Sequence, residues 1–185
     1  MYKIVIISSI MFYVFQLLGQ ESISMKGKYV IDGNFSVINY NGDYYGEHSS
    51  LLMGVGLDKY ISKYMGIGGR LNFNSLRVEN STASTIFVGP SVSFSIAPFV
   101  SSGYESILFL RVSYFFIREK ISNSSSGISW GGSSLQYSGG IMSFIFKNVA
   151  LRGEVGYSFD SYNPPELSKL EGNRFFIILG FSIII

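Results

Sequence analysis

Seven charged residues occupy polar positions in segments where bulky apolar residues alternate with small polar ones: Asp32, Asp58, Arg70, Arg111, Arg152, Glu154 and Asp160. If these positions line the inside of a barrel, the charges must pair, because an unpaired buried charge is costly. We expect an Arg–carboxylate network around Arg70, Arg111, Arg152 and Glu154. It could form a gated polar path, a solute site, or a structural plug. We favour the plug, since a barrel of eight strands, the number that the alternation of this sequence predicts, lacks an open channel.

The only histidine, His48, is followed by Ser49 and Ser50. A Ser–His pair is reactive when the hydroxyl reaches the imidazole and a third group orients the ring. Residues two apart share a face of an extended chain, so Ser50 could meet His48, with Asp43 or Glu47 as the orienting carboxylate. The alternative, which we favour, is a solvated loop histidine and no catalytic residue.

Composition excludes several classes of site. Cysteine is absent, so a disulfide, a cysteine–zinc site and a thiol nucleophile are impossible. The 14 basic and 12 acidic residues are too evenly balanced for a nucleic-acid-binding surface. The sequence also lacks the glycine loop that binds phosphates and the His-Glu-x-x-His zinc motif. We therefore expect no cofactor, no metal site and no nucleic-acid partner.

The chain is apolar overall, but past residue 25 it is nowhere apolar for long. Hydrophobic residues make up 47% of the 185 residues and charged residues 14%, against about 25% in a typical domain. Past residue 25 the apolar residues recur at every second position, as in Ile86, Val88, Val92 and Phe94. A period of two is typical of strands with one apolar face.

The alternation predicts eight strands and no helix. The expected strands lie near 27–39, 50–58, 65–76, 85–97, 105–117, 134–146, 149–159 and 173–185. Short connections (59–64, 98–104, 147–148) take turns with long ones (40–49, 77–84, 118–133, 160–172), as in outer-membrane barrels. An even number of strands places both ends of the domain on the periplasmic side.

The small polar face should line the interior, because bulky side chains would overfill so narrow a lumen. The bulky face then meets lipid. Aromatic residues near the strand ends predict two interfacial girdles. One girdle comprises Tyr60, Tyr64, Phe99, Tyr104, Phe144 and Phe146, and the other Phe73, Phe87, Phe115, Phe116, Tyr157, Phe159, Phe175 and Phe176.

The first residues predict an exported protein. Lys3 precedes an apolar run from Ile4 to Leu18, and the small residue Gly19 follows. This is the pattern of a secretory signal peptide, which we assign to 1–19, leaving the domain at 20–185. A short membrane anchor is the alternative, but a helix of this length spans only about 22 Å.

Several motifs in order resemble a known family. They are Val88-Gly-Pro-Ser-Val92, Phe144-Ile-Phe-Lys-Asn-Val-Ala-Leu151, Gly153-Glu-Val-Gly-Tyr157 and the closing strand from Phe175 to Ile185. With them the chain resembles the small outer-membrane protein β-barrel domain family, related in form to outer-membrane proteins X, A and W of Gram-negative bacteria. The resemblance implies an all-β, eight-stranded antiparallel up-and-down transmembrane barrel. Such barrels usually end in an aromatic residue, whereas this chain ends in Ile185.

The resemblance implies a bacterial outer-membrane protein with lipid as its surroundings, inserted by the barrel-assembly machinery through its C-terminal strand. We expect a non-enzymatic monomer with a structural, surface-interaction or limited solute-passage role. Contact candidates in the loops are Tyr44, Tyr45, Trp130 and Tyr162. Some barrels of this form are lipid acyl-transfer or deacylating enzymes of the outer leaflet, which here would use His48. A third alternative is a soluble, secreted, lipocalin-like binding barrel.

Overall fold

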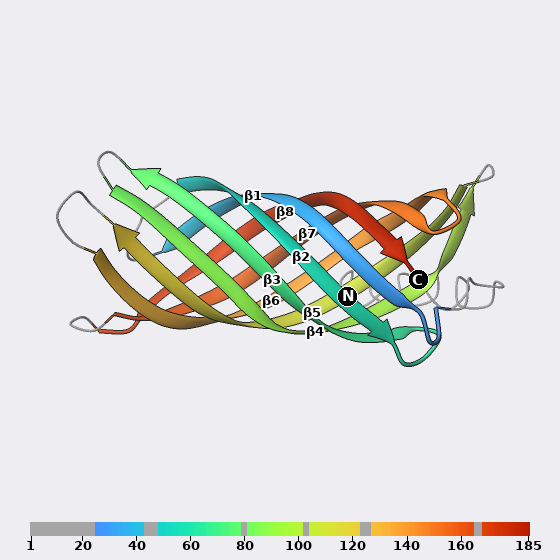
Figure 1. Cartoon of the computed structure of the whole chain (residues 1–185), viewed down its shortest axis with the longest axis horizontal. Helices are drawn as coiled ribbons and strands as arrows, with labels where there is room; N and C mark the ends of the chain where they lie inside the picture. Colours follow the sequence, from blue (N-terminus) through green and yellow to red (C-terminus); the bar gives the residue numbers. More distant parts are fainter. Residues whose placement is uncertain (1–24, 43–47, 79–80, 102–103, 123–126, 165–167) are drawn as a thin grey trace, which may run out of the picture.

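A closed barrel of eight antiparallel strands makes up the computed structural model (Figure 1). The structure describes residues 25–185 apart from 43–47, 79–80, 102–103, 123–126 and 165–167. Each strand pairs with its neighbours in the chain, and β1 pairs with β8 to close the barrel. The strands are β1 (Tyr29–Gly42), β2 (His48–Tyr60), β3 (Met65–Val78), β4 (Ser81–Ser101), β5 (Tyr104–Ser122), β6 (Gly127–Phe146), β7 (Val149–Asn163) and β8 (Leu170–Ile184).

The all-β, up-and-down prediction is confirmed. Within the described residues, no helix is long and apolar enough to cross a membrane. The expected signal peptide, residues 1–19, lies outside the described part of the chain.

We call the end where β1 begins and β8 finishes the terminal end, and the opposite end the loop end. The terminal end also carries the connections 61–64, 102–103 and 147–148.

The expected loop boundaries are wrong at the loop end. Residues 118–133 were expected to form a loop, but β5 and β6 stay paired from Ile117 and Gly132 out to Ser122 and Gly127. The connection there is 123–126, and that between β3 and β4 is 79–80 instead of 77–84. The apolar alternation stops where a lipid layer would stop, whereas backbone pairing continues beyond it.

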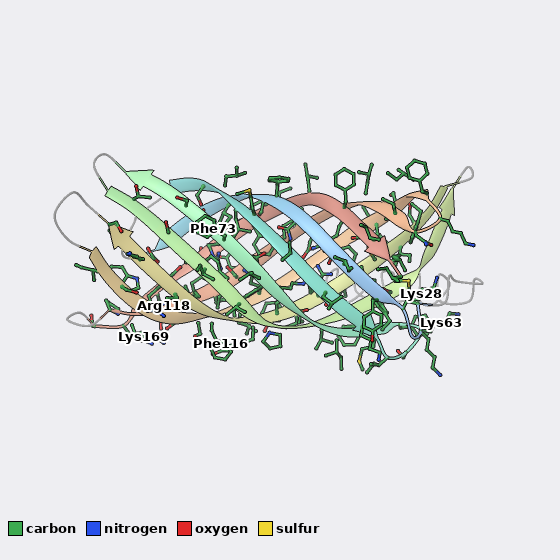
Figure 2. The ribbon with its side chains drawn as sticks, viewed as in Figure 1. Lys28, Lys63, Phe73, Phe116, Arg118 and Lys169 are labelled. Carbon is green, nitrogen blue, oxygen red and sulfur yellow. The ribbon has the colours of Figure 1, made fainter. Side chains whose placement is uncertain are left out.

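Large apolar side chains are exposed on the outside of all eight strands. The outward apolar residues of β5 run at alternate positions from the half-buried Leu108 through the exposed Leu110 to Phe116, and Arg118 follows. That stretch matches the roughly 9–11 residues that a tilted strand needs to cross a bilayer. Figure 2 shows Phe73 and Phe116 on the outside, with Lys28 and Lys63 toward the terminal end and Arg118 and Lys169 toward the loop end.

The two predicted aromatic girdles are only partly correct. Tyr60, Phe87, Phe115 and Phe176 are buried inside the barrel. Phe144 is half-buried beside the interior cluster at the terminal end. The exposed members are Tyr64, Phe73, Phe116, Phe146, Tyr157, Phe159 and Phe175, while the side chains of Phe99 and Tyr104 lie outside the described part. The error has a simple cause: neighbours such as Phe115 and Phe116 lie on opposite faces of one strand.

The lumen also holds bulky residues, contrary to the expectation of a small polar lining. They form two clusters. The loop-end cluster consists of Ile38, Leu52, Phe87, Phe115, Ile117, Trp130, Tyr162, Phe176 and Ile178. The terminal-end cluster consists of Met25, Val30, Tyr60, Ile107, Phe109, Met142, Ala150 and Ile184. Glycines opposite the largest rings supply the space: a Cβ atom at Gly140, which pairs with Phe109, would lie 2.9 Å from Cζ of that ring.

Candidate functional site

Six charged side chains meet in the lumen between the two apolar clusters, and we call them the lumen network. They are Asp32 of β1, Asp58 of β2, Arg70 of β3, Arg111 of β5, and Arg152 and Glu154 of β7. All six side chains are buried. Alternation explains how they meet, because each residue occupies an inward position of its strand.

Two aspartates receive most of the arginine contacts. Oδ2 of Asp32 lies 2.8 Å from NH2 of Arg70, 3.3 Å from NH2 of Arg111 and 2.7 Å from NH1 of Arg152. Oδ2 of Asp58 lies 2.7 Å from NH2 of Arg70 and 3.2 Å from NH2 of Arg111. Each aspartate is therefore shared between arginines from different strands, which ties the walls of the barrel together across the lumen.

Glu154 completes the network from β7. Its Oε2 atom accepts a hydrogen bond of 2.9 Å from NH1 of Arg111 and pairs with Arg152 on its own strand. The three carboxylates balance the charge of the three arginines. Buried charges need such a balance, because a buried charge without a partner of opposite charge is strongly destabilising.

Serine hydroxyls also donate hydrogen bonds to the three carboxylates. Ser91 and Ser93 donate to Asp58 at 2.9 and 3.0 Å, and Ser182 donates to Asp32 at 2.5 Å. Ser138 donates in the same way to Oε1 of Glu154. Small inward residues thus leave room for the arginines and also complete their counterions' hydrogen bonds.

Phe109 covers the network on its terminal side. The guanidinium carbons of Arg111 and Arg152 lie 5.0 and 5.4 Å from the centre of its ring. A cation over an aromatic face is attracted by the negative charge density of the ring. The ring, a member of the terminal-end cluster, therefore contacts both that cluster and the charged layer.

Asp160, expected in the same network, lies in a separate ion pair nearer the loop end. Its Oδ1 atom accepts a hydrogen bond of 2.9 Å from NH2 of Arg174 on β8. Arg174 also donates to Ser158 and Ser134 at 3.1 Å each, and its guanidinium lies 4.4 Å from the ring centre of Phe87. The sequence reasoning missed Arg174, although it has the same parity as the inward-facing Ser182 in the closing strand.

The structure describes two of the four loop-contact candidates, and both are buried. Trp130 and Tyr162 are not loop residues: they lie in β6 and β7, each is 8% exposed, and both belong to the loop-end cluster. Gly and Ser around Trp130 resemble a loop in the sequence, but here they belong to an extended strand, with Ser129 and Gly131 exposed on its outside. Tyr44 and Tyr45 lie outside the described residues.

His48 is the first residue of β2 and pairs in register with Tyr40. Asp43 and Glu47, the proposed orienting carboxylates, lie outside the described residues. Across the part of the chain that the structure describes, no three His, Cys, Asp or Glu side chains are grouped as metal ligands. The lumen network is therefore the candidate site that the described geometry supports best.

No protein-family model and no curated protein sequence matches the chain. The barrel is similar to solved structures of small bacterial surface proteins. Neisserial surface protein A is 13% identical, with a TM-score of 0.61 over 85% of this chain and 97% of that one. The attachment invasion locus protein of Yersinia pestis is 13% identical, with a TM-score of 0.54 over 86% and 100%. The outer membrane protein OprG of Pseudomonas aeruginosa is 12% identical, with a TM-score of 0.53 over 87% and 97%.

These likenesses establish the fold of a small outer-membrane β-barrel. The apolar outside and charged inside agree with that fold, because an outer-membrane barrel presents its apolar face to lipid. A lipocalin-like barrel would have the opposite arrangement, with an apolar interior for its ligand and a polar outside. The soluble alternative is therefore not favoured.

Proposed function

We propose that this chain is a non-enzymatic, monomeric outer-membrane protein of a Gram-negative bacterium, with a closed lumen and a structural or surface-contact role. We also propose that it belongs to the small outer-membrane protein β-barrel domain family. One observation carries the closed lumen: a charge-balanced, buried lumen network lies between two apolar clusters.

A plug explains this layering better than a solute path. A hydrated solute would have to separate ion pairs that connect β1, β2, β3, β5 and β7. Removing one partner of a buried pair typically costs about 3–5 kcal/mol. The solute would also have to pass two layers of packed apolar side chains, which offer no hydrogen bonds in exchange for its water.

The closing strand supports assembly as an outer-membrane barrel. Tyr29 and Ile185 exchange two backbone hydrogen bonds of 2.8 and 2.9 Å, which close the seam at the terminal end. The outward residues of β8 are apolar from Phe175 to Ile183. We propose that the barrel-assembly machinery binds this strand.

Conductance across a planar lipid bilayer tests the closed lumen. We expect no stable current through the wild-type barrel, and none through Arg152→Met, which should instead be less stable to unfolding by urea. Discrete ohmic steps from the wild type, or current that appears only in Arg152→Met, would show that the network gates a path.

The non-enzymatic role has its own measurement. Mass spectra of lipid A from cells expressing the wild type, His48→Ala or no barrel should show the same acyl chains. An acyl chain gained or lost only with the wild type would establish the outer-leaflet enzyme instead.

A further inference from the structure

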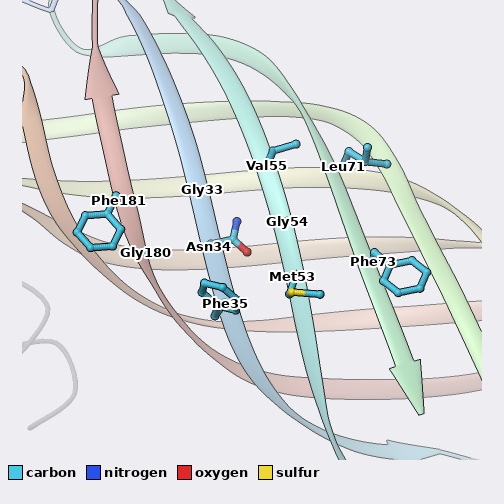
Figure 3. A pocket seen from close by; sticks show the side chains of 10 residues that line it. All are labelled: Gly33, Asn34, Phe35, Met53, Gly54, Val55, Leu71, Phe73, Gly180 and Phe181. Atoms are coloured by element: carbon cyan, nitrogen blue, oxygen red, sulfur yellow. The ribbon is translucent and has the colours of Figure 1, made fainter. Parts of the chain in front are cut away.

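An apolar furrow crosses the outside of the barrel. Its first part has a volume of about 460 Å³ and lies over Gly33 of β1. Figure 3 shows Phe35, Met53, Phe73 and Phe181 around it, contributed by β1, β2, β3 and β8. Gly33 makes the hollow possible, since a Cβ atom there would meet nothing within 4 Å.

The furrow continues toward β4. Its second part has a volume of about 520 Å³, lies over Gly69 and is bounded on β4 by Val88 and Pro90. The two parts share Val55 and Leu71. A Cβ atom at Gly69 would meet only a backbone oxygen at 3.8 Å, so this floor is open as well.

Two cations lie toward the loop end on β5, the strand next to the edge of the furrow on β4. Arg118 and Lys120 are exposed on the outside of β5, directly beyond the apolar run that ends at Phe116. Their cross-strand neighbours carry no negative charge: Ile86 and Gly131 flank Arg118, while Ser84 and Ser129 flank Lys120. Neither cation makes an ion pair with a residue that the structure describes.

The strand register connects the cations to the furrow. Arg118 pairs with Ile86 of β4, and the next outward residue of β4, Val88, already lines the furrow. From there β4 runs toward the terminal end, so the furrow passes from the cation pair into the apolar band. Two cations on the loop-end side of an apolar furrow match a lipid that has a phosphate headgroup and acyl chains.

We propose that Arg118, Lys120 and the furrow over Gly69 bind a phosphate-bearing lipid of the outer leaflet. The two cations hold the phosphate, and one acyl chain lies in the furrow. The guanidinium of Arg118 suits this ligand because its planar donors match phosphate oxygens in pairs. This inference rests on the proposed outer-membrane placement and deepens its lipid partner.

The terminal end supplies a matched control. Lys59 and Lys63 are also cations beside the apolar band, but each lies 5.3 Å from the centre of a tyrosine ring, Tyr29 and Tyr64 respectively. Replacing these two lysines removes the same charge as replacing Arg118 and Lys120. A difference between the two double variants therefore reports the position of the charge.

Native mass spectrometry of the full chain, released from detergent with diphosphoryl lipid A, measures the binding. One cation near a lipid surface is worth about a fivefold change in affinity, so R118Q/K120Q should bind about 25-fold more weakly. K59Q/K63Q should stay within about twofold of the wild type. Equal losses in both double variants would overturn the site.

Two further comparisons test the lipid. Gly69→Leu fills the furrow and should weaken binding, whereas Gly153→Leu, on an open outward position of β7, should not. Dephosphorylated lipid A should bind the wild type and R118Q/K120Q equally weakly. Inorganic phosphate that binds the wild type and Gly69→Leu as strongly as lipid A does would establish a free-anion site and overturn the lipid proposal. Urea unfolding and bilayer conductance of the same variants keep this result separate from the closed-lumen proposal.

Discussion

Gly56 and Arg70 pair in the register of β2 and β3, and a Cβ atom at Gly56 would lie 2.6 Å from NH1 of Arg70. Because Gly56 has no side chain, the guanidinium of Arg70 can occupy the space beside it. Asp58 and Gly68 repeat the arrangement two residues along, where a Cβ atom at Gly68 would overlap the aspartate carboxylate. Inward glycines thus determine where the lumen network fits.

Gly56→Ala should therefore destabilise the barrel by about 1–3 kcal/mol, the usual cost of overpacking. Arg70 cannot turn away without leaving Asp32 and Asp58. Urea unfolding in detergent micelles, followed by circular dichroism, measures the effect. Gly33→Ala is the control, because its new methyl group points into open space. Equal stabilities of the two variants would contradict the steric account.

Arg111→Met should cost about 3–5 kcal/mol of unfolding free energy, because Arg111 contacts three carboxylates that would lose a counterion. Arg111→Met combined with Glu154→Gln should be less destabilised than the sum of the single variants. Arg118→Met, which removes an exposed arginine from the same strand, should change stability by no more than about 0.5 kcal/mol. Additive single and double variants would mean that Arg111 and Glu154 are not coupled.

Val155→Arg tests which face meets lipid. Val155 is 53% exposed and lies near the middle of β7, so an arginine there should cost about 2–4 kcal/mol in a lipid bilayer. Thr82→Arg, on an exposed position near the loop end of β4, should cost about 0–1 kcal/mol. The comparison needs unfolding measured in vesicles. A soluble barrel would tolerate both arginines equally.

Single-cysteine variants test the orientation. The wild type has no cysteine, so every label reports the introduced residue. Ser168→Cys, beside the connection before β8, should react with a membrane-impermeant maleimide on whole cells. Ser62→Cys, in the turn after β2 at the terminal end, should react only after the outer membrane is opened. The reverse pattern would place the chain termini outside the cell.

Alternation was sufficient to predict the strands and most of the lumen network. Arg152 and Glu154 alternate with Leu151 and Val155, so their shared face can be read directly. The pattern fails where consecutive residues are all bulky, as at Phe115 and Phe116, because either side chain could then point inward. The partners within the lumen depend on the stagger between strands, which the sequence of one strand does not contain.

Arg174 shows the same limit at the closing strand. Both faces of that segment are apolar, so the sequence assigned no charge of the segment to the lumen. The inside of a barrel this narrow can still accept Phe176 and Ile178, because the glycine opposite Phe176, Gly156, leaves space for the ring. The composition of one segment therefore does not reveal that a narrow lumen can hold large side chains when each one lies opposite a glycine on the neighbouring strand.

Through the ion pair between Asp160 and Arg174, the last strand supplies the counterion of a buried carboxylate. Asp160 comes from β7, and its arginine comes from β8. A chain without β8 would leave the carboxylate of Asp160 without this cation, and Asp32 would lack the hydroxyl of Ser182. Pairing of β8 therefore closes the barrel and brings Asp160 its counterion in the same step, while the lumen network needs no charge from β8.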